Sequence, residues 1–161
     1  MVSISVPNSS IYLSFILAYV LTVIPVSWPV ATYMPSWVFI TSLFWAIFFP
    51  HKHGVGMAWF AGLWLDVVMG YPLGVNAFSM AISIALAIFI GPRFRIYSVG
   101  LQTWMVFVLA AVCQLLIFWA KNIFSVPASG LSSLWGAVTS ALVWPLIYAY
   151  LRVVARIFHL I

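Results

Sequence analysis

Six apolar stretches divide the sequence, and the prolines and glycines between them limit the folds that the chain can adopt. The stretches are 11–24, 37–49, 54–69, 75–90, 101–120 and 131–151. Proline lacks a backbone donor and glycine tolerates tight turns, so these residues mark the ends of regular elements. The stretches lack the apolar–polar alternation that a membrane β-barrel requires. The pattern therefore predicts six helices.

Charged side chains are too few for a water-soluble domain of this size. Of the 161 residues, 66% are hydrophobic and 4% are charged, whereas an ordinary soluble domain carries roughly a quarter charged residues. A small fold could not hide so much apolar surface from water, but a helix of about 20 apolar residues crosses a bilayer. We therefore expect an all-α integral membrane protein, a single domain over residues 1–161 with six transmembrane helices.

The few cations predict the orientation of the chain in the membrane. With both termini in the cytoplasm, Lys121 faces outward and the other cations face inward, namely Lys52, Arg93, Arg95, Arg152 and Arg156. This is the bias expected of cytoplasmic loops. The net charge of +5 is therefore a topology signal, and we expect no nucleic-acid partner.

Asp66, the only acidic side chain, lies in a regular array of small residues. Gly54, Ala58, Gly62, Asp66 and Gly70 recur every four residues. On a helix this spacing places the central three on one face, and small residues let a second helix approach closely in lipid. That second helix could belong to this chain or to a partner protein.

A carboxylate is costly in hydrocarbon, so we expect Asp66 to face protein. The next stretch begins beyond Gly74, and the free amides that start a helix favour a neighbouring carboxylate. Asn76 and Lys121 lie on the same side of the membrane and could also pair with it. We expect Asp66 to fix the turn at 70–74 through such contacts, and Asp66→Asn to do modest damage because it keeps acceptor capacity. A role in a partner interface, or in ion or proton coupling, stays open.

The third and fourth stretches are short for membrane spans. Each has 16 residues, hence about 24 Å of helix against about 30 Å of hydrocarbon. We expect the turn at 70–74 to be recessed below the outer surface.

Catalytic and metal sites are not expected. Acid–base catalysis needs two titratable groups within reach, and the chain has one carboxylate. His51 and His53 are separated from Asp66 by about 20 Å of helix, and two imidazoles without further ligands do not make a zinc site. We expect both histidines to be polar turn residues at the interface, and the protein to have no cofactor and no enzymatic activity.

The stretch 35–82 resembles the MreD family of rod shape-determining membrane proteins. The shared features include Pro-His at 50–51, Leu-Asp at 65–66 and Leu-Gly-Val at 73–75, and the later FWAKN at 118–122 extends them. The resemblance implies a non-enzymatic scaffold in the bacterial inner membrane that binds MreC. Through MreC it would contact MreB and the RodA–transpeptidase pair that builds the lateral peptidoglycan wall. It also implies a fold similar to the substrate-binding components of energy-coupling-factor transporters, and a structural or partner-interface use for the small-residue motif: Gly54, Ala58, Gly62, Asp66, Gly70, Gly74 and Asn76.

A vitamin-capture subunit of such a transporter is the alternative. Ser14, Ala18 and Thr22 form a small-residue stripe in the first stretch, where those subunits dock their coupling partner. Substrate pockets, however, gather several polar groups, and the outer half of this chain offers few: Asp66, Asn76, Gln114, Lys121 and Asn122. The sequence therefore favours the scaffold.

Overall fold

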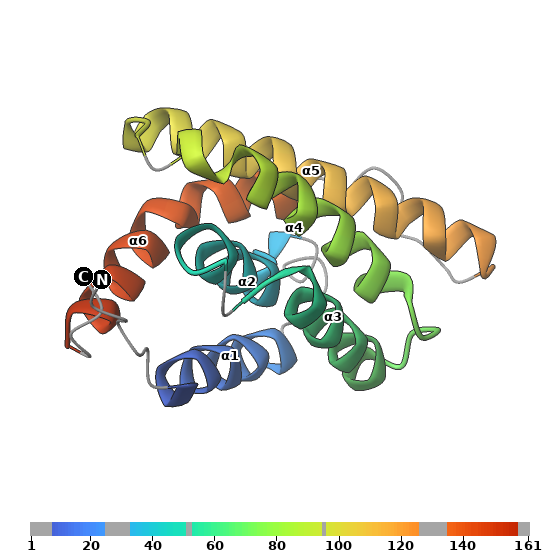
Figure 1. The fold of residues 1–161 in the computed structure, drawn as a ribbon. Coiled ribbons are helices and arrows are strands. Elements are labelled where there is room, and N and C mark those ends of the chain that lie inside the picture. The colour runs from blue at the N-terminus through green and yellow to red at the C-terminus, as the bar shows by residue number, and fades with distance from the viewer. Residues whose placement is uncertain (1–7, 25–32, 51–52, 95, 126–134, 158–161) are drawn as a thin grey trace.

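The computed structural model describes the chain apart from residues 1–7, 25–32, 51–52, 95, 126–134 and 158–161. The described residues form six helices, as predicted (Figure 1). They are α1 (Asn8–Val23), α2 (Trp37–Phe48), α3 (Val55–Met69), α4 (Val75–Phe94), α5 (Val99–Ile123) and α6 (Trp135–Ile157).

Two of the predicted helix ends are wrong. The fourth stretch was expected to end at residue 90, but α4 continues through Pro92 to Phe94. The sixth stretch, which was expected to include Pro145, was predicted to end at residue 151, but α6 continues to Ile157. A proline removes one backbone hydrogen bond, and helices in apolar surroundings tolerate it because neighbouring groups satisfy the freed carbonyl. Consequently α4 has 20 residues, or about 30 Å, and of the two stretches that were expected to be short only α3, with 15 residues, remains so.

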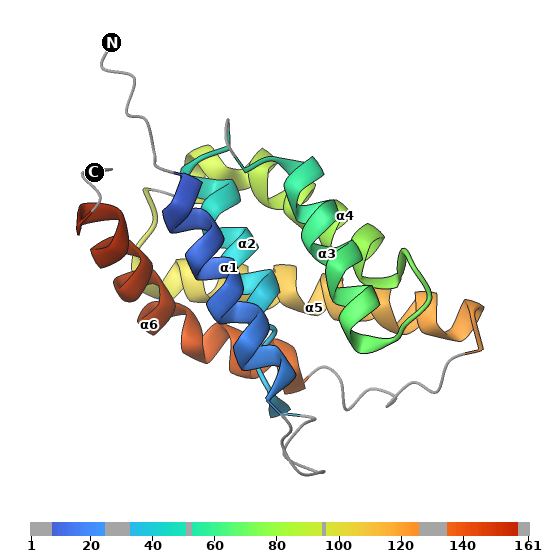
Figure 2. The same ribbon diagram turned by 90° about the horizontal axis from the view of Figure 1, so that it is seen from below.

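The central element is α2, which is apolar all round. Every residue from Val38 to Ile47 is buried, as expected of a helix enclosed by others. It packs against α1, α3, α4 and α6. Figure 1 places α1 and α5 on opposite sides of it, and Figure 2 shows α1 lying in front of it. The core of the protein is therefore built around its shortest helix.

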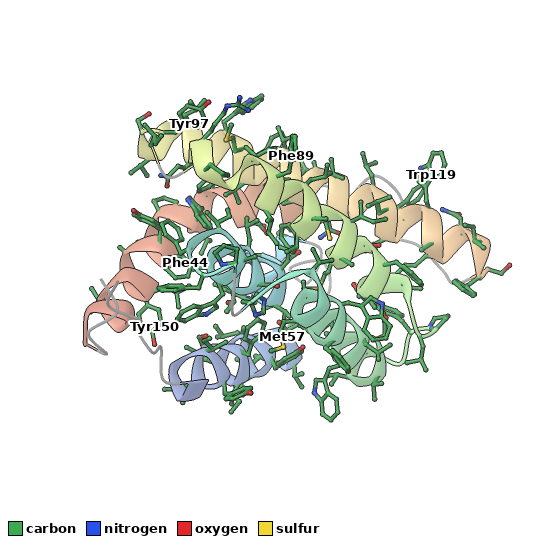
Figure 3. All side chains as sticks on the ribbon, in the orientation of Figure 1. Phe44, Met57, Phe89, Tyr97, Trp119 and Tyr150 are labelled. Carbon is green, nitrogen blue, oxygen red and sulfur yellow. The ribbon has the colours of Figure 1, made fainter. Side chains whose placement is uncertain are left out.

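Large apolar side chains cover the outside of the bundle. Phe89 on α4 and Trp119 on α5 are 82% and 70% exposed, and both project outward in Figure 3, whereas Phe44 of α2 points into the bundle. Among the described residues, α4 and α5 are long and apolar enough to cross a membrane, and the apolar segments of the other four helices are shorter, at Ile11–Val23, Trp37–Phe48, Val55–Met69 and Trp135–Leu151. An apolar exterior of this kind is stable against lipid chains, which supports the membrane assignment.

Candidate functional site

The carboxylate of Asp66 is buried and accepts four hydrogen bonds from the start of α4. Its Oδ1 accepts from the backbone N of Asn76 at 2.9 Å and from its Nδ2 at 2.8 Å. Its Oδ2 accepts from the backbone N of Gly74 at 2.9 Å and of Ala77 at 3.3 Å. The predicted hydrogen bonds to the fourth helix and to Asn76 are therefore present.

These contacts complete the backbone hydrogen bonding at the start of α4. The amide of Val75 donates to the carbonyl of Pro72 at 3.3 Å, and the amide of Phe78 makes the first helical bond to Gly74 at 2.9 Å. Together with the three amides on Asp66, every N–H from Gly74 to Phe78 has an acceptor. The first amides of a helix otherwise lack partners, and in a membrane no water replaces them.

Asp66 also closes the end of α3 through its backbone. Its carbonyl accepts from the amide of Tyr71 at 2.9 Å, and the amide of Gly70 donates to Val67 at 3.3 Å. This is the Schellman arrangement, which requires a left-handed residue after the helix, and Gly70 has φ +68°. One residue therefore joins the end of α3 to the beginning of α4.

Both oxygens of Asp66 are used, and this corrects the expectation for Asp66→Asn. An asparagine side chain has one acceptor oxygen and an NH₂ group that can only donate. In either orientation of the amide, its nitrogen would face two N–H groups that now donate to a carboxylate oxygen. These two donors would then lack an acceptor. The substitution therefore does not keep the acceptor capacity, and the damage should exceed the modest effect that the sequence suggested.

The small residues on α3 bring it against α4 of the same chain. A Cβ added at Gly62 would lie 2.6 Å from the Cα of Ala77, so the two backbones meet without an intervening side chain. Ala58 is fully buried, as is Asp66. Gly54 and Gly70 cap the two ends of the helix. The close approach therefore lies within the bundle, and a partner helix could not reach Gly62 without displacing α4.

Lys121 does not pair with Asp66. Its ammonium lies 3.8 Å from the centre of the Tyr71 ring, a cation–π contact. The sequence placed Lys121 at the same end of the helices as Asp66, as the structure does, but did not identify Tyr71, because the contact joins α5 to a turn about fifty residues earlier in the chain.

His53 is buried, and its prediction as an interfacial residue is wrong. Its amide donates to the carbonyl of Phe49 at 2.9 Å, and its side chain is fully buried. The ring Nε2 lies 3.0 Å from Oγ of Ser42, and the ring packs on Phe15 with 5.1 Å between centroids. Burial lowers the pKa of His53 from 6.5 to about 4. Its neighbour His51 lies outside the described residues.

The small-residue stripe of α1 faces its own bundle. Ser14 and Ala18 are buried, and the indole Nε1 of Trp45 on α2 donates to Oγ of Ser14 at 2.8 Å. Thr22 is partly exposed, and its hydroxyl donates to Ala18 at 2.7 Å. The stripe therefore packs on α2 and gives no independent reason to expect a coupling partner there.

The protein is a small helical bundle with an apolar exterior, and its buried carboxylate is fully hydrogen-bonded. These features define the class of small helical membrane proteins. The family model described as "rod shape-determining protein MreD" matches residues 4–154. The Haemophilus influenzae protein named "Rod shape-determining protein MreD" is 28% identical over 144 residues, which cover 88% of each chain. The chain belongs to the MreD family, and its role is in rod shape determination. No solved structure matches it. The vitamin-capture alternative receives no support.

Proposed function

We propose that the chain is a non-enzymatic membrane scaffold of the complex that elongates rod-shaped cells. In this proposal it binds MreC through a helix contact in the membrane, and through MreC it supports MreB and the RodA–transpeptidase synthase in building lateral peptidoglycan. The observation that carries the proposal is the family match over residues 4–154.

The state of the only carboxylate supports a non-enzymatic role. Asp66 is fully buried and its two oxygens accept four N–H groups. A general acid or base must reach the proton that it transfers, and this carboxylate faces structural amides instead. Among the described residues no group of three or more His, Cys, Asp or Glu could hold a metal ion.

The proposed location is the inner membrane, with six spans and both termini cytoplasmic. Arg93 precedes α5 and Lys121 lies in its last turn, so these two cations are at opposite ends of a helix about 37 Å long. Positive-inside bias places the end with more cations in the cytoplasm. A reporter that is active only in the cytoplasm should be active when it is fused after residue 161. Activity at that position of a reporter that functions only in the periplasm would refute the orientation. The resemblance further suggests a helix order in space like that of energy-coupling-factor substrate components, which an experimental structure would test.

Co-purification tests the partner directly. The tagged chain, expressed at its native level in a rod-shaped host, is extracted in mild detergent and its partners are identified by mass spectrometry. The proposal predicts recovery of MreC. Recovery of an ATPase-containing transporter, or of the chain without MreC at normal membrane levels, would contradict it. Gly56→Ala is a suitable control variant, because Gly56 is exposed and nothing lies within 4 Å of an added Cβ.

A further inference from the structure

A cavity of about 570 Å³ lies at the end of the bundle where α3 stops and α4 begins. Its polar lining includes Ser36, Tyr71, Gln114 and Lys121, and most of its remaining lining is apolar. This volume lies within the range of sites that hold small molecules, which combine apolar walls with a few convergent polar groups.

Lys121 lines this cavity without an acidic partner. Asp66 is the only acidic side chain in the sequence, and its oxygens already accept four N–H groups. The ring of Tyr71, 3.8 Å from the ammonium, attracts the cation but carries no net charge to balance it. No acidic side chain of this protein is therefore free to neutralise Lys121, and a bound anionic ligand would supply the missing charge.

Neutral donors lie on the same cavity wall. The Nε2 of Gln114 donates to Oγ of Ser36 at 2.9 Å, and the second hydrogen of that NH₂ group has no acceptor among the residues that the structure describes. The Ser36 hydroxyl accepts this bond, and within the described parts of the chain its own hydrogen has no acceptor. The backbone N of Ser36 donates to Oγ of Ser140 at 2.9 Å, which holds Ser36 in place. Donors beside an ammonium suit the oxygens of a phosphate.

The apolar wall of the cavity continues onto the outside of α3. Val68 and Met69 line the cavity and are also 40% and 37% exposed, so an apolar chain that leaves the cavity meets the lipid-facing surface. When α5 spans a membrane, its last turn, which holds Lys121, would lie near the interface where lipid phosphate groups occur. A free anion would use the polar wall alone, whereas an amphiphile would use both.

We propose that this cavity binds the phosphate group of an anionic amphiphile, with Lys121, Ser36 and Gln114 contacting the phosphate and the α3 wall contacting the apolar chain. The site is independent of the MreC proposal.

Native mass spectrometry of the purified full-length chain tests the site with three probes: dioctanoyl phosphatidylglycerol, dioctanoyl phosphatidylcholine and inorganic phosphate. Wild type should bind phosphatidylglycerol most tightly and inorganic phosphate weakly. Lys121→Gln should weaken phosphatidylglycerol binding by about tenfold or more, the usual effect of losing a charge-assisted hydrogen bond, and Lys121→Arg should retain it. Arg93→Gln is the matched control, because it removes a cation that does not line the cavity.

Three outcomes would overturn the proposal. Equal binding of the two lipids, unchanged by Lys121→Gln, would mean that the lipids bind only through their chains. Phosphate binding as tight as phosphatidylglycerol binding would mean a free-anion site. If Lys121→Gln fails to fold, Val68→Trp gives a second test, because bulk on this exposed wall should weaken phosphatidylglycerol binding and leave phosphate binding unchanged; equal binding of the lipid by this variant would refute the proposal.

Discussion

Replacing Asp66 by alanine should destabilise the bundle more than any other polar-to-alanine change in α3 or α4. The substitution removes the acceptor for the amides of Asn76 and Ala77, both buried, and for the amide of Gly74, which is partly buried. It also removes the partner of the Asn76 side chain. No rotation of a neighbouring side chain replaces a carboxylate, because the chain has no second one.

The magnitude follows from the two fully buried backbone donors. Leaving a buried donor without an acceptor costs about 1–3 kcal/mol, so the pair gives a loss of roughly 2–6 kcal/mol before the Gly74 amide and the Asn76 side chain are considered. An exposed helix cap contributes only about 1 kcal/mol, because water replaces it. Since whole domains are stable by about 5–15 kcal/mol, the loss should be visible in the amount of folded protein.

The assay is reversible unfolding by SDS in mixed micelles, with Ser79→Ala as the matched control. Ser79 is buried in α4, but its hydroxyl donates within the helix to Val75 at 2.7 Å, so its removal leaves the cap intact. Asp66→Asn should lie between wild type and Asp66→Ala, and Asp66→Leu should be at least as damaging as alanine because it adds bulk. If Asp66→Ala loses no more stability than Ser79→Ala, the capping explanation is wrong.

Further predictions concern Gly62, Gly70 and His53. Gly62→Ala should be strongly destabilising because its Cβ would lie 2.6 Å from the Ala77 Cα, whereas Gly56→Ala, with open space around it, should be neutral or slightly stabilising; equal unfolding midpoints would contradict the close approach. Gly70→Ala should cost about 1 kcal/mol or more in the same assay because alanine is strained at φ +68°. Burial lowers the pKa of His53 in the folded state from 6.5 to about 4, so the unfolded state takes up the proton first as the pH falls. The unfolding free energy should therefore decrease as the pH drops through this window, by roughly 3 kcal/mol. His53→Asn should remove that part of the pH dependence, and an unchanged pH profile would refute the assignment.

The sequence predicted those features that depend on contacts between neighbouring segments of the chain. A single carboxylate in an apolar chain requires donors, and the start of the next helix was the nearest set of free amides, so the contact of Asp66 with Asn76 could be anticipated. The same reasoning predicted six helices, because apolar stretches of this length have few other stable forms in lipid.

Features that depend on packing between distant segments were not predictable in the same way. Nothing in the connection between α2 and α3 indicates that His53 turns inward to Ser42, since polarity alone suggested the interface. The contact of Lys121 with Tyr71 joins α5 to the α3–α4 turn. A central position for α2 was also hidden, although its lack of a polar face was a signal that could have been used.

The role of Asp66 in the scaffold is tested most directly by comparing cell shape with the amount of folded protein in the membrane. Wild type, Asp66→Asn, Asp66→Ala, Asp66→Leu and Gly62→Ala are expressed as the only MreD in a rod-shaped host, and cell width is measured against the amount of folded protein in the membrane. If these residues act through the fold, all five strains should follow one relation, with cells becoming rounder only as the protein level falls. An Asp66→Asn strain with a normal level of folded protein and round cells would contradict this, because the carboxylate would then serve shape determination apart from the fold.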